Sequence, residues 1–264
     1  MVSLKAFVNK WRILAKIAPF LLTIFVLKLV FHSFGWEAIS LNALFTSLIA
    51  ATTFLIGFLI TGVVSDYKES EKIPGDLASS LEAIYDEAYI THKSKKAKVT
   101  GEFLEFYEGF VKSVIHWFYK KEKTKVLMDK LHNMNDYFLQ FEGLTQANFI
   151  ARMKQEQNGI RKMVTRVHTI RETNFVASAY AILEALGIFV ISGLLLLKLE
   201  PFYESSFFAL LVSFLVLYMI FLIRDLDNPF DYAHGETGTE VSLKPLHDLV
   251  ARLEIRNRNE EAKS

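Results

Sequence analysis

Four long apolar runs constrain the fold of this chain more than any other feature. Each is long enough to cross a bilayer as a helix, which takes roughly 20 apolar residues. The runs are Ile13–Phe34, Leu44–Val64, Phe175–Leu197 and Phe207–Ile223. Soluble cores rarely contain four such runs, and the first is too long for a signal peptide and has no small-residue cleavage site after it. The sequence therefore predicts an all-α integral membrane protein with four transmembrane helices.

Lys and Arg are distributed unevenly around these runs, and the flanks that are rich in them are expected in the cytoplasm. The connection at Gly35–Ala43 has none, and the connection between runs three and four has only Lys198. The other flanks carry Lys5, Lys10, Arg12, Arg161, Lys162, Arg166, Arg171 and Arg224. This pattern predicts a multi-pass membrane protein with cytoplasmic N and C termini. The flank from Arg161 to Arg171 serves most simply as an orientation signal and a lipid-headgroup contact, or else lines the mouth of an anion pathway.

The segment between runs two and three is too polar to span a membrane and is expected to form a helical cytoplasmic domain. Amphipathic spacing predicts helices over Asp76–Thr91, Gly101–Lys120 and Lys125–Phe141, with a fourth from Gln146. The second of these helices carries a mainly aromatic stripe that is expected in the core, made of Phe103, Phe106, Phe110, Val114 and Trp117. Because no proline lies between Gln146 and Leu199, one rod is expected to run from this fourth helix through the third span. The predicted parts are residues 1–64 with spans one and two, 65–172 as the cytoplasmic domain, 173–224 with spans three and four, and 225–264 as a cytoplasmic tail.

Composition and motifs argue against an enzyme and against a nucleic-acid binder. The chain has no Cys among its 264 residues, which excludes disulfides, thiolate metal sites and a cysteine nucleophile. Its formal net charge of +1 lacks the basic surplus that phosphate backbones require. No nucleotide-binding, hydrolase or metalloprotease motif is present, and the seven His are scattered. We therefore expect no catalytic site, no cofactor and no metal site.

Glu184 is an ionisable side chain inside the third run, where a carboxylate is costly in lipid. One interpretation is a cation site, a proton site or a gating element. The other is a structural hydrogen bond to Ser or Thr on a neighbouring helix, or a position near the inner headgroups. Lys16 and Lys28, near the two ends of run one, are expected to extend toward the interfaces.

Run two carries small and hydroxyl side chains at helical spacing. Thr53, Gly57 and Thr61 form one line, and Phe54 and Phe58 lie beside it. Small residues on a membrane helix favour close packing against another helix. The same residues can line a pore, where Thr hydroxyls replace ion hydration and Phe rings form a dewetting gate.

Two local segments, together with the arrangement of spans, resemble the bestrophin superfamily, including its short prokaryotic bestrophin-like branch. The first, SDYKESEKIPGDLASSLEAI (Ser65–Ile84), is similar to the stretch where the pore helix enters the cytoplasm through a turn and a Gly-led helix follows. The second combines LIRDLDNPFDY (Leu222–Tyr232) with the later VSLKPLHDL (Val241–Leu249). Its tail motif consists of Asp227, Asn228, Pro229, Phe230 and Asp231. The resemblance covers most of the chain by topology and implies a 2+2 arrangement of spans around a helical insertion.

The resemblance also implies a homo-oligomer, expected as a pentamer, in a prokaryotic inner membrane, with the second span lining a mostly anion-conducting pore. Placing Tyr67 on the family's turn puts the hydrophobic neck at Thr53, Gly57 and Thr61, and a shift by one residue puts it at Phe54 and Phe58. The first register departs from the bulky apolar neck of the family. Acidic residues after Pro229 are sparse, so calcium control is not carried over.

The function expected from this reasoning is passive, bestrophin-like ion conduction in a homo-oligomer that contacts the lipid bilayer and inorganic ions. The resemblance to the family implies that the conducted ions are anions. The alternative is a membrane-anchored interaction or regulatory protein whose cytoplasmic bundle binds a protein partner. A transporter coupled through Glu184 has the least support, because four spans without inverted repeats are few for that class.

Overall fold

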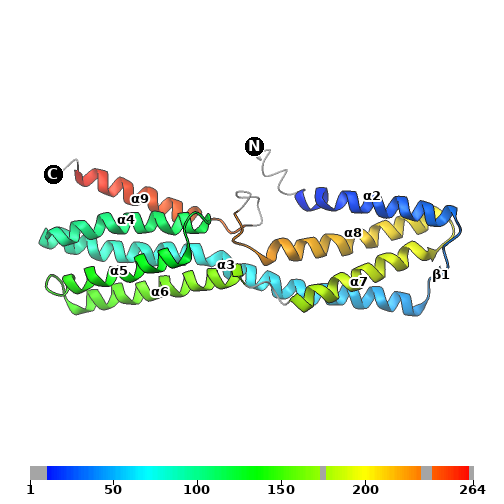
Figure 1. Ribbon diagram of the computed structural model, residues 1–264, viewed down its shortest axis with the longest axis horizontal. Helices are drawn as coiled ribbons and strands as arrows, with labels where there is room; N and C mark the ends of the chain where they lie inside the picture. The colour runs from blue at the N-terminus through cyan, green and yellow to red at the C-terminus, as the bar shows by residue number, and fades with distance from the viewer. Residues whose placement is uncertain (1–10, 173–176, 233–239, 262–264) are drawn as a thin grey trace. The chain divides into compact units, whose positions relative to one another are not determined.

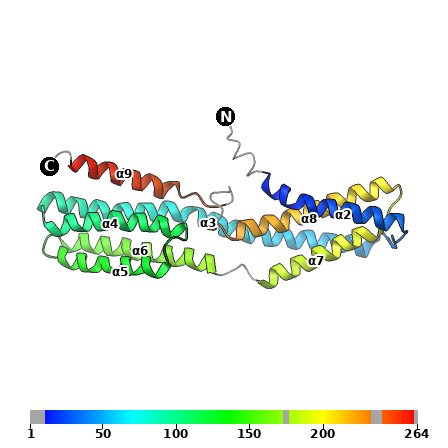
Figure 2. The same ribbon diagram turned by 45° about the horizontal axis from the view of Figure 1, so that its top comes forward.

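The computed structural model describes residues 11–172, 177–232 and 240–261. Figures 1 and 2 show the elements, which are almost all helical. They are α2 (Arg12–Ser33), β1 (Ile39–Ser40), α3 (Ala43–Lys95), α4 (Lys98–Phe118), α5 (Thr124–Phe141), α6 (Ala147–Glu172), α7 (Ala177–Leu196), β2 (Leu197–Lys198), α8 (Phe202–Asp227) and α9 (Lys244–Glu261). The chain divides into two compact units, one of Met1–Tyr67 with Asn174–Pro229 and the other of Lys68–Thr173 with Phe230–Ser264.

The first unit contains the four helices that are long and apolar enough to cross a membrane: α2, the first part of α3, α7 and α8. This confirms the predicted fold class. Its core is aliphatic and draws on three of these helices, with Ile56 and Val63 from α3, Val190 from α7, and Val216 and Ile220 from α8. The short strands β1 and β2 pair in parallel, so the connections that follow α2 and α7 are hydrogen-bonded to each other.

Close helix packing in this unit depends on two glycines of α7. A methyl group at Gly187 would lie 3.1 Å from Ile220 and 3.3 Å from Val216 of α8. A methyl group at Gly193 would overlap the ring of Phe45 on α3. Such small residues let membrane helices approach closely. The tight contacts of the unit are therefore made by span three.

The second unit consists of the later part of α3 with α4, α5, α6 and α9, and it has an aromatic core. The predicted stripe on α4 is confirmed as core, since Phe103, Phe110, Val114 and Trp117 are all buried while Phe106 is half-buried. Phe103 packs edge-on against Phe141 of α5, with ring centroids 5.3 Å apart. Amphipathic periodicity correctly placed these helices because each buries one apolar stripe.

The structure differs from the sequence expectation at the end of span two. A turn was expected between this span and a helix starting at Asp76, but α3 is one helix of 53 residues that continues through Pro74 to Lys95. A proline removes one backbone hydrogen bond from a helix. Helix propagation from both sides outweighs that loss, because Lys68, Glu69 and their neighbours are good helix formers. The expected rod from α6 into α7 depends on residues 173–176, which lie outside the described part of the chain.

Candidate functional site

The pore candidates of span two share one exposed face of α3. Phe54 and Phe58 are 77% and 69% exposed within the chain, and Thr53, Gly57 and Thr61 are exposed with them. The opposite face carries the buried residues of the core described above. Because successive residues rotate by about 100° around a helix, both registers of the expected neck fall on this broad surface. We call Thr53, Phe54, Gly57, Phe58 and Thr61 the α3 face.

The small residues of the α3 face do not pack against other helices of their own chain. Apart from the adjoining backbone of α3 itself, no described atom lies within 4 Å of the position that a Cβ on Gly57 would occupy. The Thr53 hydroxyl donates to the Ile49 carbonyl oxygen at 2.9 Å, and the Thr61 hydroxyl donates to that of Gly57 at 2.8 Å. Of the two sequence interpretations, packing within the chain is therefore not what these residues do. The face is available to a pore, a second copy or lipid.

Glu184 of α7 pairs with a cationic side chain, Arg224 of α8, which was not among its expected partners. Its carboxylate accepts a hydrogen bond from the guanidinium of Arg224 on α8, and both side chains are half-exposed in the single chain. A second pair lies close in sequence to Arg224, where Lys16 Nζ of α2 lies 2.9 Å from Asp225 Oδ1. Neighbouring cations lower the cost of a carboxylate near lipid. Glu184 and Arg224 thus form an ion pair between α7 and α8.

Lys28, which was expected to extend toward an interface, is buried within the chain and reaches groups at the ends of the membrane helices. Its side chain is 1% exposed, and its ammonium group lies 2.7 Å from Glu37 Oε1. It also donates to the carbonyl oxygens of Leu194, Leu195 and Leu197 at 3.3, 3.3 and 2.5 Å. These carbonyls belong to the last turn of α7 and to β2, where an α-helix leaves its acceptors unpaired. A buried ammonium with these four acceptors is fully hydrogen-bonded, and this removes the reason to reach for water.

Glu37 lies in the connection after α2 and completes this cluster. Burial raises the pKa of its carboxyl group, but hydrogen bonds and charge from His32 and Lys28 outweigh burial and lower the pKa overall. His32 Nδ1 lies 2.9 Å from Glu37 Oε2, and its ring stacks on Phe202 of α8. Sequence reasoning missed the cluster. Its signal was a Lys within an apolar run, with an acidic residue in the next connection.

The tail motif spans the boundary between the two units. Asp227 ends α8 and Asn228 follows it as the cap residue. In the second unit, Phe230 is fully buried and its ring centroid lies 5.8 Å from that of Phe118. Asp231 accepts from Lys120 Nζ at 2.9 Å. The second half of the motif therefore anchors the tail to the end of α4.

Tyr232 and Arg171 extend this anchor. The Tyr232 hydroxyl donates to the Val241 carbonyl oxygen at 2.6 Å. Arg171 of α6 donates to the carbonyl oxygens of Trp117 and Phe118, at 3.2 and 2.7 Å, and so caps the C-terminal end of α4. Burial lowers the pKa of this guanidinium to about 10, which leaves it charged at neutral pH. Arg171 is thus engaged within the second unit, while the lipid-headgroup contact of the flank from Arg161 to Arg171 stays a prediction.

Among the residues that the structure describes, no group of three or more His, Asp or Glu is arranged to hold a metal ion. Four acidic side chains are instead paired with Lys or Arg, namely Glu37, Glu184, Asp225 and Asp231. The described residues offer the α3 face, which carries apolar rings and hydroxyl groups, and several pairs of opposite charges.

Comparison with known proteins adds to this geometry. A family model described as the Bestrophin-like domain matches residues 17–233. The chain belongs to the bestrophin-like family. The resemblance inferred from the tail motif and the 2+2 topology of this bestrophin-like protein is thereby confirmed. A search of curated proteins finds no significant match to its sequence.

Solved structures share the fold of this bestrophin-like protein. A crystal structure of a bacterial bestrophin homologue from Klebsiella pneumoniae superposes with a TM-score of 0.76 at 15% identity, over 90% of this chain and 97% of that chain. Another structure of a bestrophin homologue from Klebsiella pneumoniae has a TM-score of 0.71 at 17% identity, over 88% and 96% of the two chains. A third, described as a membrane protein, has a TM-score of 0.74 at 16% identity, over 94% and 98%. At such low identity these likenesses show the fold alone.

Proposed function

We propose that this bestrophin-like protein is a homo-oligomeric channel through which ions flow passively, with α3 lining the pore. Membership of the family supports an ion channel in general. The observation that carries the finer proposal is the α3 face, where the exposed rings of Phe54 and Phe58 lie beside exposed hydroxyl-bearing residues on a membrane-spanning helix. Ring side chains next to hydroxyls suit a narrow, partly dewetted conduit.

Several copies are needed to build such a conduit. One chain supplies one α3 face, which is a single wall, so the pore requires further copies around a common axis. Closed cyclic symmetry is the usual arrangement for identical subunits, and the family resemblance suggests five. A protein that stays monomeric in mild detergent and in bilayers would contradict this proposal.

Two arguments about ion class point in opposite directions. The family resemblance implies anions. The hydroxyl protons of Thr53 and Thr61, however, are directed to backbone carbonyls of α3, which leaves the oxygen lone pairs as the free polar groups of the α3 face. Oxygen lone pairs coordinate cations, whereas anions need N–H or O–H donors. The anion proposal therefore requires these hydroxyls to rotate or another part of the pore to select.

The test is ion flux from liposomes that contain the purified protein, with a salt gradient so that the sign of the reversal potential separates anions from cations. Thr61→Phe is expected to reduce or abolish the current. Thr23→Phe is the matched control, because Thr23 is also exposed on a membrane helix and also donates to a carbonyl four residues earlier, at 2.9 Å, but lies on α2. Equal currents for both variants would place the pore elsewhere.

The alternative function gains support from one outcome of this experiment. If folded, oligomeric protein carries no current under any gradient, the cytoplasmic bundle becomes the active part of the molecule. A membrane-anchored interaction protein would then be the better proposal.

A further inference from the structure

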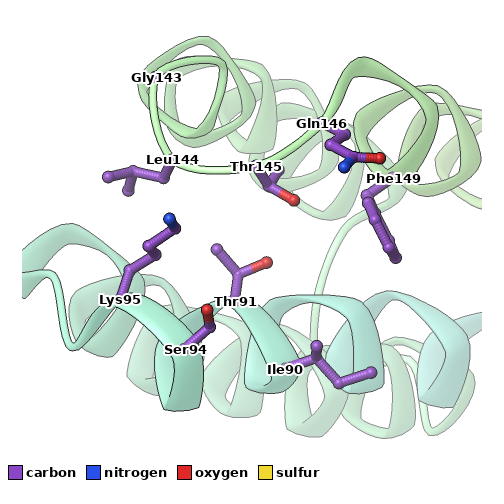
Figure 3. A pocket seen from close by; sticks show the side chains of 9 residues that line it. All are labelled: Ile90, Thr91, Ser94, Lys95, Gly143, Leu144, Thr145, Gln146 and Phe149. Atoms are coloured by element: carbon purple, nitrogen blue, oxygen red, sulfur yellow. The ribbon is translucent and has the colours of Figure 1, made fainter.

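A surface pocket lies within the second unit, between the end of α3 and the connection that joins α5 to α6. Its volume is about 460 Å³, which falls within the roughly 300–1,000 Å³ typical of small-molecule sites. Figure 3 shows its two walls, with the side chains of α3 on one side and those of the α5–α6 connection and the start of α6 on the other. None of its lining residues belongs to the α3 face.

One part of the pocket lining offers hydrogen-bond donors and a positive charge. Ser94 and Lys95 come from the last turns of α3, and Thr145 and Gln146 come from the facing connection. Figure 3 shows the Lys95 side chain extending from α3 toward that connection. Within the described residues, these four side chains make no hydrogen bond or ion pair with the rest of the chain, and no acidic residue lines the pocket. The donors therefore have no partner within the chain.

Another part of the lining is apolar. Ile90 of α3, Leu144 of the connection and Phe149 of α6 supply hydrocarbon surface, and Ile90 is 55% exposed. Pockets of this composition bind molecules that have an apolar body and one polar end. Lys95 is the one cation among the lining residues, and it matches the single negative charge of one carboxylate.

We propose that this pocket binds a small organic anion, a monocarboxylate with an apolar body. The carboxylate accepts hydrogen bonds from the Lys95 ammonium group and from the Ser94, Thr145 and Gln146 side chains. The hydrocarbon part lies against Ile90, Leu144 and Phe149. Binding in this pocket does not require ion conduction. A negative result in the flux experiment would therefore not contradict the binding site, and a negative result in the binding experiment would not contradict the channel.

The test is titration of benzoate into the purified full-length protein, followed by calorimetry. Benzamide serves as a neutral molecule of the same shape. Lys95→Gln removes the cation from the pocket, and Lys98→Gln is the matched control, since Lys98 changes the net charge equally but is 91% exposed and outside the lining. Ser94→Phe, at an exposed helix position, fills the pocket.

Saturable benzoate binding is expected, stronger than that of benzamide. It should weaken about tenfold in Lys95→Gln, as loss of a charge-assisted hydrogen bond implies, stay unchanged in Lys98→Gln and disappear in Ser94→Phe. The proposal is overturned if benzoate shows no saturable binding, or if Lys95→Gln and Ser94→Phe bind it as the wild type does. It is also overturned if Ser94→Phe breaks up the oligomer in size-exclusion chromatography, because the pocket would then be a subunit contact.

Discussion

The ammonium nitrogen of Lys28 lies 2.7 Å from Glu37 Oε1, with the two side chains only 1% and 6% exposed. The pair connects the interior of α2 to the connection that follows it. The same ammonium holds three carbonyl oxygens at the end of α7 and in β2. One buried charge thus links two membrane helices at the ends where the short parallel strands meet.

Replacing Lys28 by Met is expected to destabilise the protein by about 3–5 kcal/mol, because it leaves a buried carboxylate and three carbonyls without their donor. The measurement is thermal unfolding in detergent. Lys16→Met is the matched control on the same helix. Its pair with Asp225 is partly exposed, so a loss of less than about 1 kcal/mol is expected. Equal losses of unfolding free energy in the two variants would show that the buried Lys28 cluster stabilises the protein no more than the partly exposed pair of Lys16.

The stability of this cluster should fall with acidification. Hydrogen bonds and nearby cations lower the pKa of Glu37 below its ordinary value of 4.5. A carboxylate with a lowered pKa contributes stability above its ordinary pKa, and this contribution is lost as the pH falls through the folded-state pKa. Glu37→Gln should therefore be less stable at neutral pH and should lose less on acidification below 4.5. Parallel acid-unfolding curves for wild type and variant would rule the effect out.

Phe54→Ala and Phe58→Ala are expected to increase the ion current in liposomes, because shorter side chains widen and wet a hydrophobic constriction. Phe189→Ala provides the comparison, since Phe189 lies on α7 and is 64% exposed, close to the 69% of Phe58. Its current should equal that of the wild type. If all three variants conduct alike, α3 does not line the pore.

Phe230→Ala tests the anchor of the tail. This ring is fully buried against Phe118, so its removal should cost about 3–5 kcal/mol in the unfolding of the second unit. Hydrogen exchange of α9 should rise as well, because the chain that leads to α9 loses its attachment. Asp231→Asn, beside it, removes an exposed pair with Lys120 and should change stability by less than about 1 kcal/mol. An unchanged exchange rate in Phe230→Ala would mean that α9 holds itself in place.

Glu184→Gln is expected to leave ion flux close to wild type and to reduce stability by no more than about 1 kcal/mol, since the pair with Arg224 is half-exposed. Flux assays at several pH values provide the measurement, with Arg224→Gln run beside it to separate pairing from charge. Loss of flux in Glu184→Gln alone would revive the interpretation of Glu184 as an ion or proton site.

The sequence by itself determined the membrane class, the four spans and the helical character of the second unit. Hydropathy over about 20 residues and apolar spacing near 3.6 are local properties, so they can be read along the chain. The family followed from the order of spans and from the place of Asp227–Asp231 after the fourth span. Local reasoning also correctly placed the aromatic stripe of α4 in the core.

The tertiary structure alone decided which side chains meet. The residues around Lys28 in the sequence do not predict that its ammonium group donates to carbonyl oxygens at the end of α7. The residues around Arg171 likewise do not predict that its guanidinium donates to the carbonyl oxygens of Trp117 and Phe118. The two neck registers seemed to be alternatives, yet Thr53 and Phe54 share one exposed face because the core covers the opposite side of α3. Partners and exposed faces depend on how helices far apart in the chain pack together. Packing of that kind is a non-local property, and residue spacing within one segment does not contain it.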